Sequence, residues 1–80
     1  MKIYKIWQRD NSGYDTYDSA VVCAVDEDDA RSIHPGGGVC IDETVNYDSW
    51  VTKSKVVVEC IGEAYGDVKR GVIVSSFNAG

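Results

Sequence analysis

Residues 21–38 constrain the fold more than any other part of the chain, because a strand, a helix and a helix stop follow one another there. The run Val-Val-Cys-Ala-Val is rich in β-branched residues, which is typical of a central strand. Four consecutive acids follow it, and acids are favoured at the positive N-terminal end of a helix. Pro35 and three glycines then stop the helix. A single short helix, over roughly residues 27–34, is therefore expected directly after a strand.

The acid run has a structural explanation. We expect Asp26 to cap the helix by accepting a hydrogen bond from its first turn, with Asp29 reaching back as in a capping box. Arg31 and His34 then fall in the last turn, where positive charge is favoured. A calcium loop of the EF-hand type needs alternating acids and a fixed glycine, and residues 26–29 have neither.

The rest of the chain predicts strands rather than further helices. Short runs of β-forming residues cover residues 2–8, 19–25, 55–64 and 72–77, with a shorter candidate at 39–41. The apolar run at 56–61 suggests a strand that is buried on much of both faces. With one helix, most strands must join through hairpins and pair antiparallel. We predict a single α+β domain, residues 1–80, with a three- to five-stranded antiparallel sheet and one short helix on one face, in the order β-β-α-(β)-β-β.

Three cysteines, Cys23, Cys40 and Cys60, form an odd set without a C-x-x-C pair, which argues against a secreted disulfide scaffold. Cys23 and Cys60 lie in apolar runs and are expected to be buried. No apolar run is long enough to span a membrane, and the first residues are too polar for a secretory leader. We therefore expect a cytoplasmic protein with reduced thiols.

The candidate chemical motifs do not point to catalysis. One histidine and three cysteines lack the close ligand pairs of a zinc site, so no metal and no cofactor are expected. Glycines 36–38 follow the helix, whereas a phosphate loop precedes one, so they are read as a helix stop. A nucleophile pair of Cys40 and His34 would require the loop to fold back, and no oxyanion site accompanies it. We predict that the chain is not an enzyme and that His34 has a capping role.

Negative charge is concentrated in the middle of a chain whose net charge is −5. Residues 10–48 hold ten acids and one base, Arg31, for a net −9. This distribution does not favour direct nucleic-acid binding, which needs a basic footprint. It suits a protein partner with a basic surface. The alternative is an acidic, solvated face that keeps a small protein soluble.

Aromatic residues accompany the acids in segments that do not resemble strands. A Tyr-Asp pair occurs three times, at 14–15, 17–18 and 47–48, and Trp50 follows the last pair. Tyrosine and tryptophan are common at interfaces because each combines a large apolar area with a polar group. These rings could equally close the edges of a small core. As partner-binding residues we predict Asp15, Tyr17, Asp18, Asp42, Tyr47, Asp48 and Trp50.

Several stretches carry a family resemblance. Residues 14–22 (YDTYDSAVV), Ala30-Arg31 with Ile33-His34-Pro35, Gly71-Val72-Ile73 and residues 76–80 (SFNAG) resemble a group of short uncharacterised proteins encoded in phages and prophages. The resemblance runs along the whole chain and brings no catalytic motif. It implies, by association, an accessory or anti-defence role. Small acidic α+β proteins that inhibit CRISPR complexes are similar in size and style.

Two functions remain open at this stage. The first is an interaction protein, anti-CRISPR-like, that occupies a basic nucleic-acid-binding surface of a host complex. The second is a small-ligand or nucleotide-binding protein, in which Trp7, Trp50 or tyrosines stack on a base. A phosphate ligand would need bases such as Lys53, Lys55, Lys69 and Arg70 gathered around a pocket; the interaction protein would place its acids on one open face. A chain this short buries a small core, so a homodimer is a further expectation.

Overall fold

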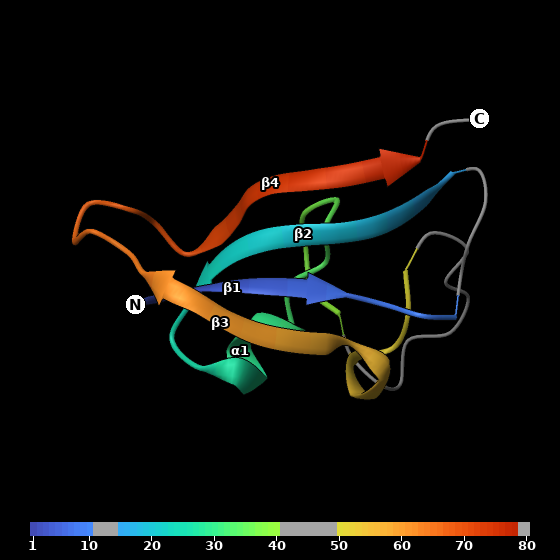
Figure 1. Cartoon of the computed structure of the whole chain (residues 1–80), viewed down its shortest axis with the longest axis horizontal. Helices are drawn as coiled ribbons and strands as arrows, with labels where there is room; N and C mark the ends of the chain where they lie inside the picture. Colours follow the sequence, from blue (N-terminus) through green and yellow to red (C-terminus); the bar gives the residue numbers. More distant parts are fainter. Residues whose placement is uncertain (11–14, 41–49, 79–80) are drawn as a thin grey trace.

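The computed structural model describes residues 1–10, 15–40 and 50–78. Four strands form one antiparallel sheet in the spatial order β3-β1-β2-β4 (Figure 1). The strands are β1 (Lys2–Trp7), β2 (Thr16–Ala24), β3 (Val57–Glu63) and β4 (Gly71–Asn78). The helix α1 (Glu27–Arg31) and the 3-10 turn η1 (Lys53–Lys55) lie between β2 and β3 along the chain. The predicted α+β fold, an antiparallel sheet with one short helix packed on it, is confirmed.

The order of the strands differs from a series of hairpins. Only β1 and β2 are both consecutive in sequence and paired; β3 pairs with β1, and β4 pairs with β2. β3 and β4 therefore form opposite edges of the sheet, and residues 64–70 carry the chain from one edge to the other (Figure 1). The expectation that most pairs are hairpins is wrong. The first hairpin holds the centre of the sheet, so both later strands add to its outer sides.

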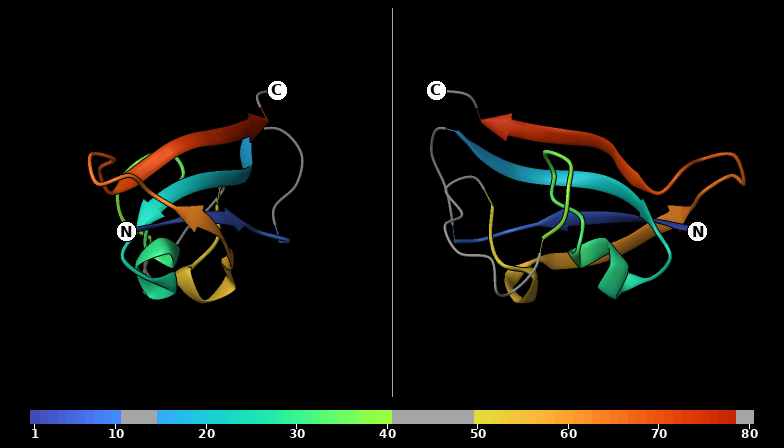
Figure 2. Two further views of the ribbon diagram at one scale, coloured as in Figure 1. Left: turned by 60° about the vertical axis from the view of Figure 1, so that its left-hand side comes forward. Right: turned by 180° about the vertical axis from the view of Figure 1, so that it is seen from behind.

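The core lies on one face of the two central strands. Alternate side chains of β1 and β2 point to the same side of a sheet, and the register places Ile6 opposite Ala20 and Tyr4 opposite Val22. Figure 2 shows α1 against this face. Cys23 alternates to the opposite face and is also buried, with its Sγ 4.0 Å from the carbonyl oxygen of Val68. The buried cluster consists of Tyr4, Ile6, Ala20, Val22, Ala24, Ala30, Ile33, Cys40, Trp50, Val51 and Val56.

The cap of α1 follows the prediction from the acid run. The backbone N–H of Asp29 donates to the Asp26 carboxylate at 2.8 Å. The Asp29 carboxylate in turn accepts from the backbone N–H of Val25 at 3.0 Å. The two bonds satisfy two donors at the helix start. They differ from a capping box in that Asp29 accepts from the residue before the cap rather than from Asp26 itself.

The helix is shorter than the sequence suggested. It ends at Arg31, because the Ser32 hydroxyl donates to the Asp29 carbonyl at 2.6 Å and competes with a further helical turn. Ile33 then forms an isolated bridge with Val39. His34 consequently lies beyond the helix, which corrects its predicted place in the last turn. The short strand expected at 39–41 is limited to this bridge at Val39; residue 41 lies outside the described residues.

The edge position of β3 corrects two further expectations. Most of its side chains are exposed, so it is not buried on both faces. Cys60 lies on this strand and is exposed, whereas Cys23, on the central strand β2, is buried as predicted. Among the residues described here, no helix is long and apolar enough to cross a membrane.

Candidate interaction surface

Two of the predicted acids meet at the start of β2. Asp15 adopts a positive φ of 61°, which Asp tolerates better than most residues, and its backbone N–H donates to the carbonyl of Asn78. A bulge follows, because Tyr17 pairs with Phe77 while Ser19 pairs with the next residue of β4, and this leaves Asp18 as the extra residue of β2. Both carboxylates are consequently held outward at one end of the sheet, where both residues are exposed.

An aromatic cluster lies beside these acids. The rings of Tyr17 and Phe77 lie 4.7 Å apart, centroid to centroid, and the imidazole of His34 meets Tyr17 edge-on at 5.8 Å. Tyr17 is half-buried against the core, but Phe77 is 44% exposed. We call Asp15, Tyr17, Asp18 and Phe77 the acidic aromatic end. Phe77 was missed in the sequence because its nearness to Tyr17 depends on the pairing of β4 with β2.

His34 is held in place by a loop that needs glycine. Its Nδ1 accepts from the backbone N–H of Gly36 at 2.9 Å. A Cβ at Gly36 would lie 2.8 Å from the Tyr17 hydroxyl, so only glycine lets the loop approach the ring this closely. Burial lowers the pKa of His34 below its usual value. The imidazole is therefore neutral at pH 7, and its observed contacts are structural.

The other predicted binding residues lie elsewhere. Trp50 is fully buried and is the largest side chain of the core, so it belongs to the core rather than to a partner-binding surface. The Tyr-Asp pair before it suggested an interface, but the indole ring fills part of the core of this small domain. Asp42, Tyr47 and Asp48 lie outside the described residues.

The ion pairs separate the acids into two groups. Asp28 pairs with Lys53 at 3.0 Å, Asp10 with Lys55 at 2.9 Å and Asp29 with Arg70 at 2.6 Å. All eight Lys and Arg residues of the chain lie in the described ranges. Asp15 and Asp18 form an ion pair with none of them.

The paired acids of α1 and the unpaired acids Asp15 and Asp18 lie at opposite ends of β2, whereas Asp10, which is paired with Lys55, follows β1 at the end nearer Asp15 and Asp18. The helix acids follow the last residue of β2, whereas Asp15 and Asp18 are at its start. The nine residues of β2 span roughly 30 Å at about 3.3 Å per residue. The acidic aromatic end is therefore a separate feature, with negative charge that no base of the chain neutralises by direct contact.

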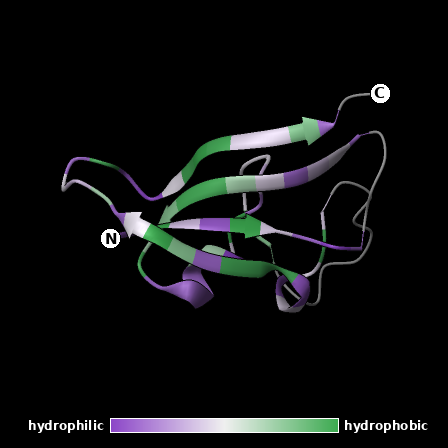
Figure 3. Cartoon of the chain, viewed as in Figure 1, coloured by the Kyte–Doolittle hydropathy of each residue, from purple (hydrophilic) through white to green (hydrophobic). Residues whose placement is uncertain are grey.

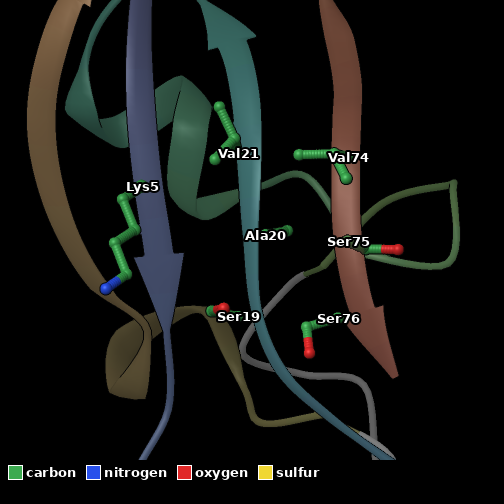
Figure 4. A pocket seen from close by; sticks show the side chains of 7 residues that line it. All are labelled: Lys5, Ser19, Ala20, Val21, Val74, Ser75 and Ser76. Carbon is green, nitrogen blue, oxygen red and sulfur yellow. The ribbon is translucent and has the colours of Figure 1, made fainter.

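The face of the sheet opposite α1 carries a shallow pocket with a volume of about 130 Å³. Figure 4 shows Lys5, Ser19, Val21, Val74 and Ser76 around it, from β1, β2 and β4. The Lys5 ammonium lies 5.2 Å from the centroid of the Trp7 ring. Small-molecule sites usually enclose about 300–1,000 Å³, so this pocket is small for a nucleotide.

No protein-family model, no curated protein and no solved structure matches this chain. Within the described residues, no group of three or more His, Cys, Asp or Glu side chains could hold a metal ion. The acidic aromatic end combines two exposed carboxylates with a partly exposed aromatic pair.

Proposed function

We propose that this protein is a small interaction module that binds a basic surface of another protein through its acidic aromatic end. The observation that carries the proposal is the contrast among the acids: Asp10, Asp28 and Asp29 are paired with bases of the chain, whereas Asp15 and Asp18 are exposed and unpaired with any described base. Unneutralised carboxylates attract a basic partner during encounter and set its orientation.

The aromatic pair adds a contact that charge alone does not provide. Phe77 exposes part of its ring beside the carboxylates. A lysine or arginine side chain can lay its aliphatic stem or its cation against such a ring while its charge meets a carboxylate. Basic surfaces of this kind are common on nucleic-acid-binding proteins. The finer form of the proposal, supported by the phage resemblance, is an anti-CRISPR-like inhibitor that covers the nucleic-acid-binding surface of a host defence complex.

The ligand-binding alternative has weaker support. Lys53, Lys55 and Arg70 are engaged in ion pairs rather than gathered around a pocket. Lys5 is the one base that lines the pocket on the open face, and a phosphate group needs converging cations. Trp50 is buried, so of the two tryptophans only Trp7 is placed to stack on a ligand.

Affinity capture with matched variants tests the interaction. The chain is immobilised, and proteins retained from a bacterial lysate are quantified by mass spectrometry. Asp15→Asn with Asp18→Asn removes two charges and leaves the fold intact, because asparagine also tolerates a positive φ. Glu59→Gln with Glu63→Gln removes the same charge from the edge strand β3 and is the control.

The proposal predicts partners that the wild type and the control retain and that the Asp15/Asp18 variant loses. Binding should weaken as salt is added, because exposed charges are screened beyond about 8–10 Å at physiological ionic strength. Added nucleic acid should compete if the partner's basic surface is a nucleic-acid site. Partners that the Asp15/Asp18 variant retains at equal strength would contradict the proposal.

A further inference from the structure

The two edges of the sheet are built differently. β3 carries Glu59 and Glu63, and charged side chains on an edge discourage pairing with another strand. β4, from Gly71 to Asn78, has no charged residue and no proline. Figure 3 shows its ribbon apolar to neutral over most of its length. An exposed, uncharged and apolar edge of this length is what natural sheets usually avoid unless something covers it.

The outer side of β4 is available for pairing with another strand. Within the described residues its single strand neighbour is β2, so its other side faces no strand. A bulge at Ile73 bends the first part of β4, but from Val74 onward the strand adds no further extra residue against β2. Four of its side chains are large, apolar and exposed: Val72, Ile73, Val74 and Phe77.

We propose that the β4 edge pairs antiparallel with the β4 edge of a second copy of this chain, about a two-fold axis near Ser75. Two-fold pairing brings the same surface against itself, so it succeeds where that surface is self-complementary. An uncharged strand meets this condition, because no like charges face each other across the axis. The pairing also removes the exposed edge from both copies and ends the joined sheet at the two acidic β3 edges, so it closes as a dimer.

The charges that flank β4 favour this orientation and this occupant. Lys69 precedes the strand, as does Arg70, which is already paired with Asp29. Asp15 and Asp18 lie beside the end of the strand through contacts with Asn78 and Ser76. In an antiparallel pair the basic start of one β4 lies next to the acidic end of the other. A parallel pair would instead bring the two basic ends together.

The test is a charge-swap pair at the proposed axis. Ser75 is exposed, so lysine or glutamate there is compatible with the folded monomer. The mass of the native chain is measured by light scattering and sedimentation over a concentration series, with near-ultraviolet circular dichroism to confirm folding. The variants are Ser75→Lys and Ser75→Glu, each alone and as an equimolar mixture, and the control is Glu63→Lys on the β3 edge.

The proposal predicts twice the monomer mass for the wild type and for the Glu63→Lys control. Each Ser75 variant alone should dissociate at several-fold higher concentration, because like charges then face each other across the axis. Their mixture should restore a dimer, now between the two variants. Backbone amides of β4 should gain protection from hydrogen exchange as the concentration rises.

A chain that is monomeric throughout the series would overturn the proposal and leave the edge to a strand of another protein. A dimer that tolerates both Ser75 variants but responds to Glu63→Lys would also overturn it, by placing the contact at β3. Oligomeric mass and lysate capture are separate measurements, so a failed dimer leaves the proposed function standing. A confirmed dimer brings Lys69 of the second copy toward Asp15 and Asp18, and capture by the dimer then shows whether these acids still bind a partner.

Discussion

Asp29 is the side chain whose loss we expect to reveal most about how α1 is held. Its carboxylate accepts from the backbone N–H of Val25 at 3.0 Å and from Nε and Nη2 of Arg70 at 2.9 and 2.6 Å. It therefore ties the start of the helix to the residue just before β4. The Arg70 hydrogen bond, ahead of the backbone bond, holds the pKa of Asp29 below its usual value.

The magnitude follows from these contacts. A backbone hydrogen bond contributes about 0.5–1.5 kcal/mol. The ion pair is discounted to the range of exposed pairs, about 0.2–1 kcal/mol, because 48% of the Arg70 side chain is exposed. Asp29→Ala should thus lower the free energy of unfolding by about 0.7–2.5 kcal/mol. Asp29→Asn, which keeps an oxygen for Val25, should cost only the ion pair, about 0.2–1 kcal/mol.

Thermal and urea unfolding measure both variants, and a loss of 1 kcal/mol should lower Tm by about 4–8 °C in a domain of this size. Asp28→Ala is the matched control, since it removes the neighbouring acid and its pair with Lys53. The Asp28 side chain is 79% exposed, so its loss should change stability by no more than about 0.5 kcal/mol.

The pH dependence gives an independent check. Because the pKa of Asp29 is lower in the folded state, its stabilisation is complete above about pH 3.9, the usual Asp value. It is lost as the pH falls toward the lowered folded value. The stability difference between wild type and Asp29→Asn should therefore shrink in strong acid. An equal difference at neutral and acid pH, or an Asp28→Ala variant as destabilised as Asp29→Ala, would refute this reasoning.

Two further outcomes are expected. Trp50→Ala should cost about 3–5 kcal/mol in urea unfolding, because its ring is fully buried; a near-neutral result would mean that the ring does not pack the core. Stability should decline as the pH falls below about 6.5, since burial lowers the pKa of folded His34 and the unfolded chain then binds the proton more readily. Protonation also removes the acceptor for the Gly36 N–H. His34→Gln should flatten this part of the stability profile, and an unchanged slope would exclude His34 as its source.

Local features were the most predictable from the sequence. The cap of α1 depends on residues within four positions of one another, so Asp26 and Asp29 could be assigned from their order alone. The central place of β2 followed in the same way from its β-branched residues. The helix end was less predictable, because Ser32 and the Ile33–Val39 bridge end it earlier than Pro35 would.

Features that depend on distant pairing could not be read from the sequence. The apolar run of β3 fits a doubly buried strand and a half-covered edge strand equally well, and only the strand order separates them. The same limit explains Cys60, which is exposed on that edge, and Phe77, which meets Tyr17 only because β4 pairs with β2. Trp50 sits in a polar stretch, and its role in the core depends on the path of the chain around it.

The acids show how one residue type divides into two roles within a small protein. In the sequence, the run at α1 is the stronger acidic signal because its four members are adjacent. In the fold that run is largely engaged: Asp26 caps the helix, Asp28 binds Lys53 and Asp29 binds Arg70. A carboxylate already paired with a base of its own chain has less charge to offer a partner. Asp15 and Asp18 are held outward by a positive φ and a bulge and pair with no base of the chain, so their charge remains available to a partner. We therefore expect Asp15 and Asp18, the less conspicuous acids in the sequence, to contact a basic surface. An Asp26→Ala variant that remains folded should bind a partner as the wild type does.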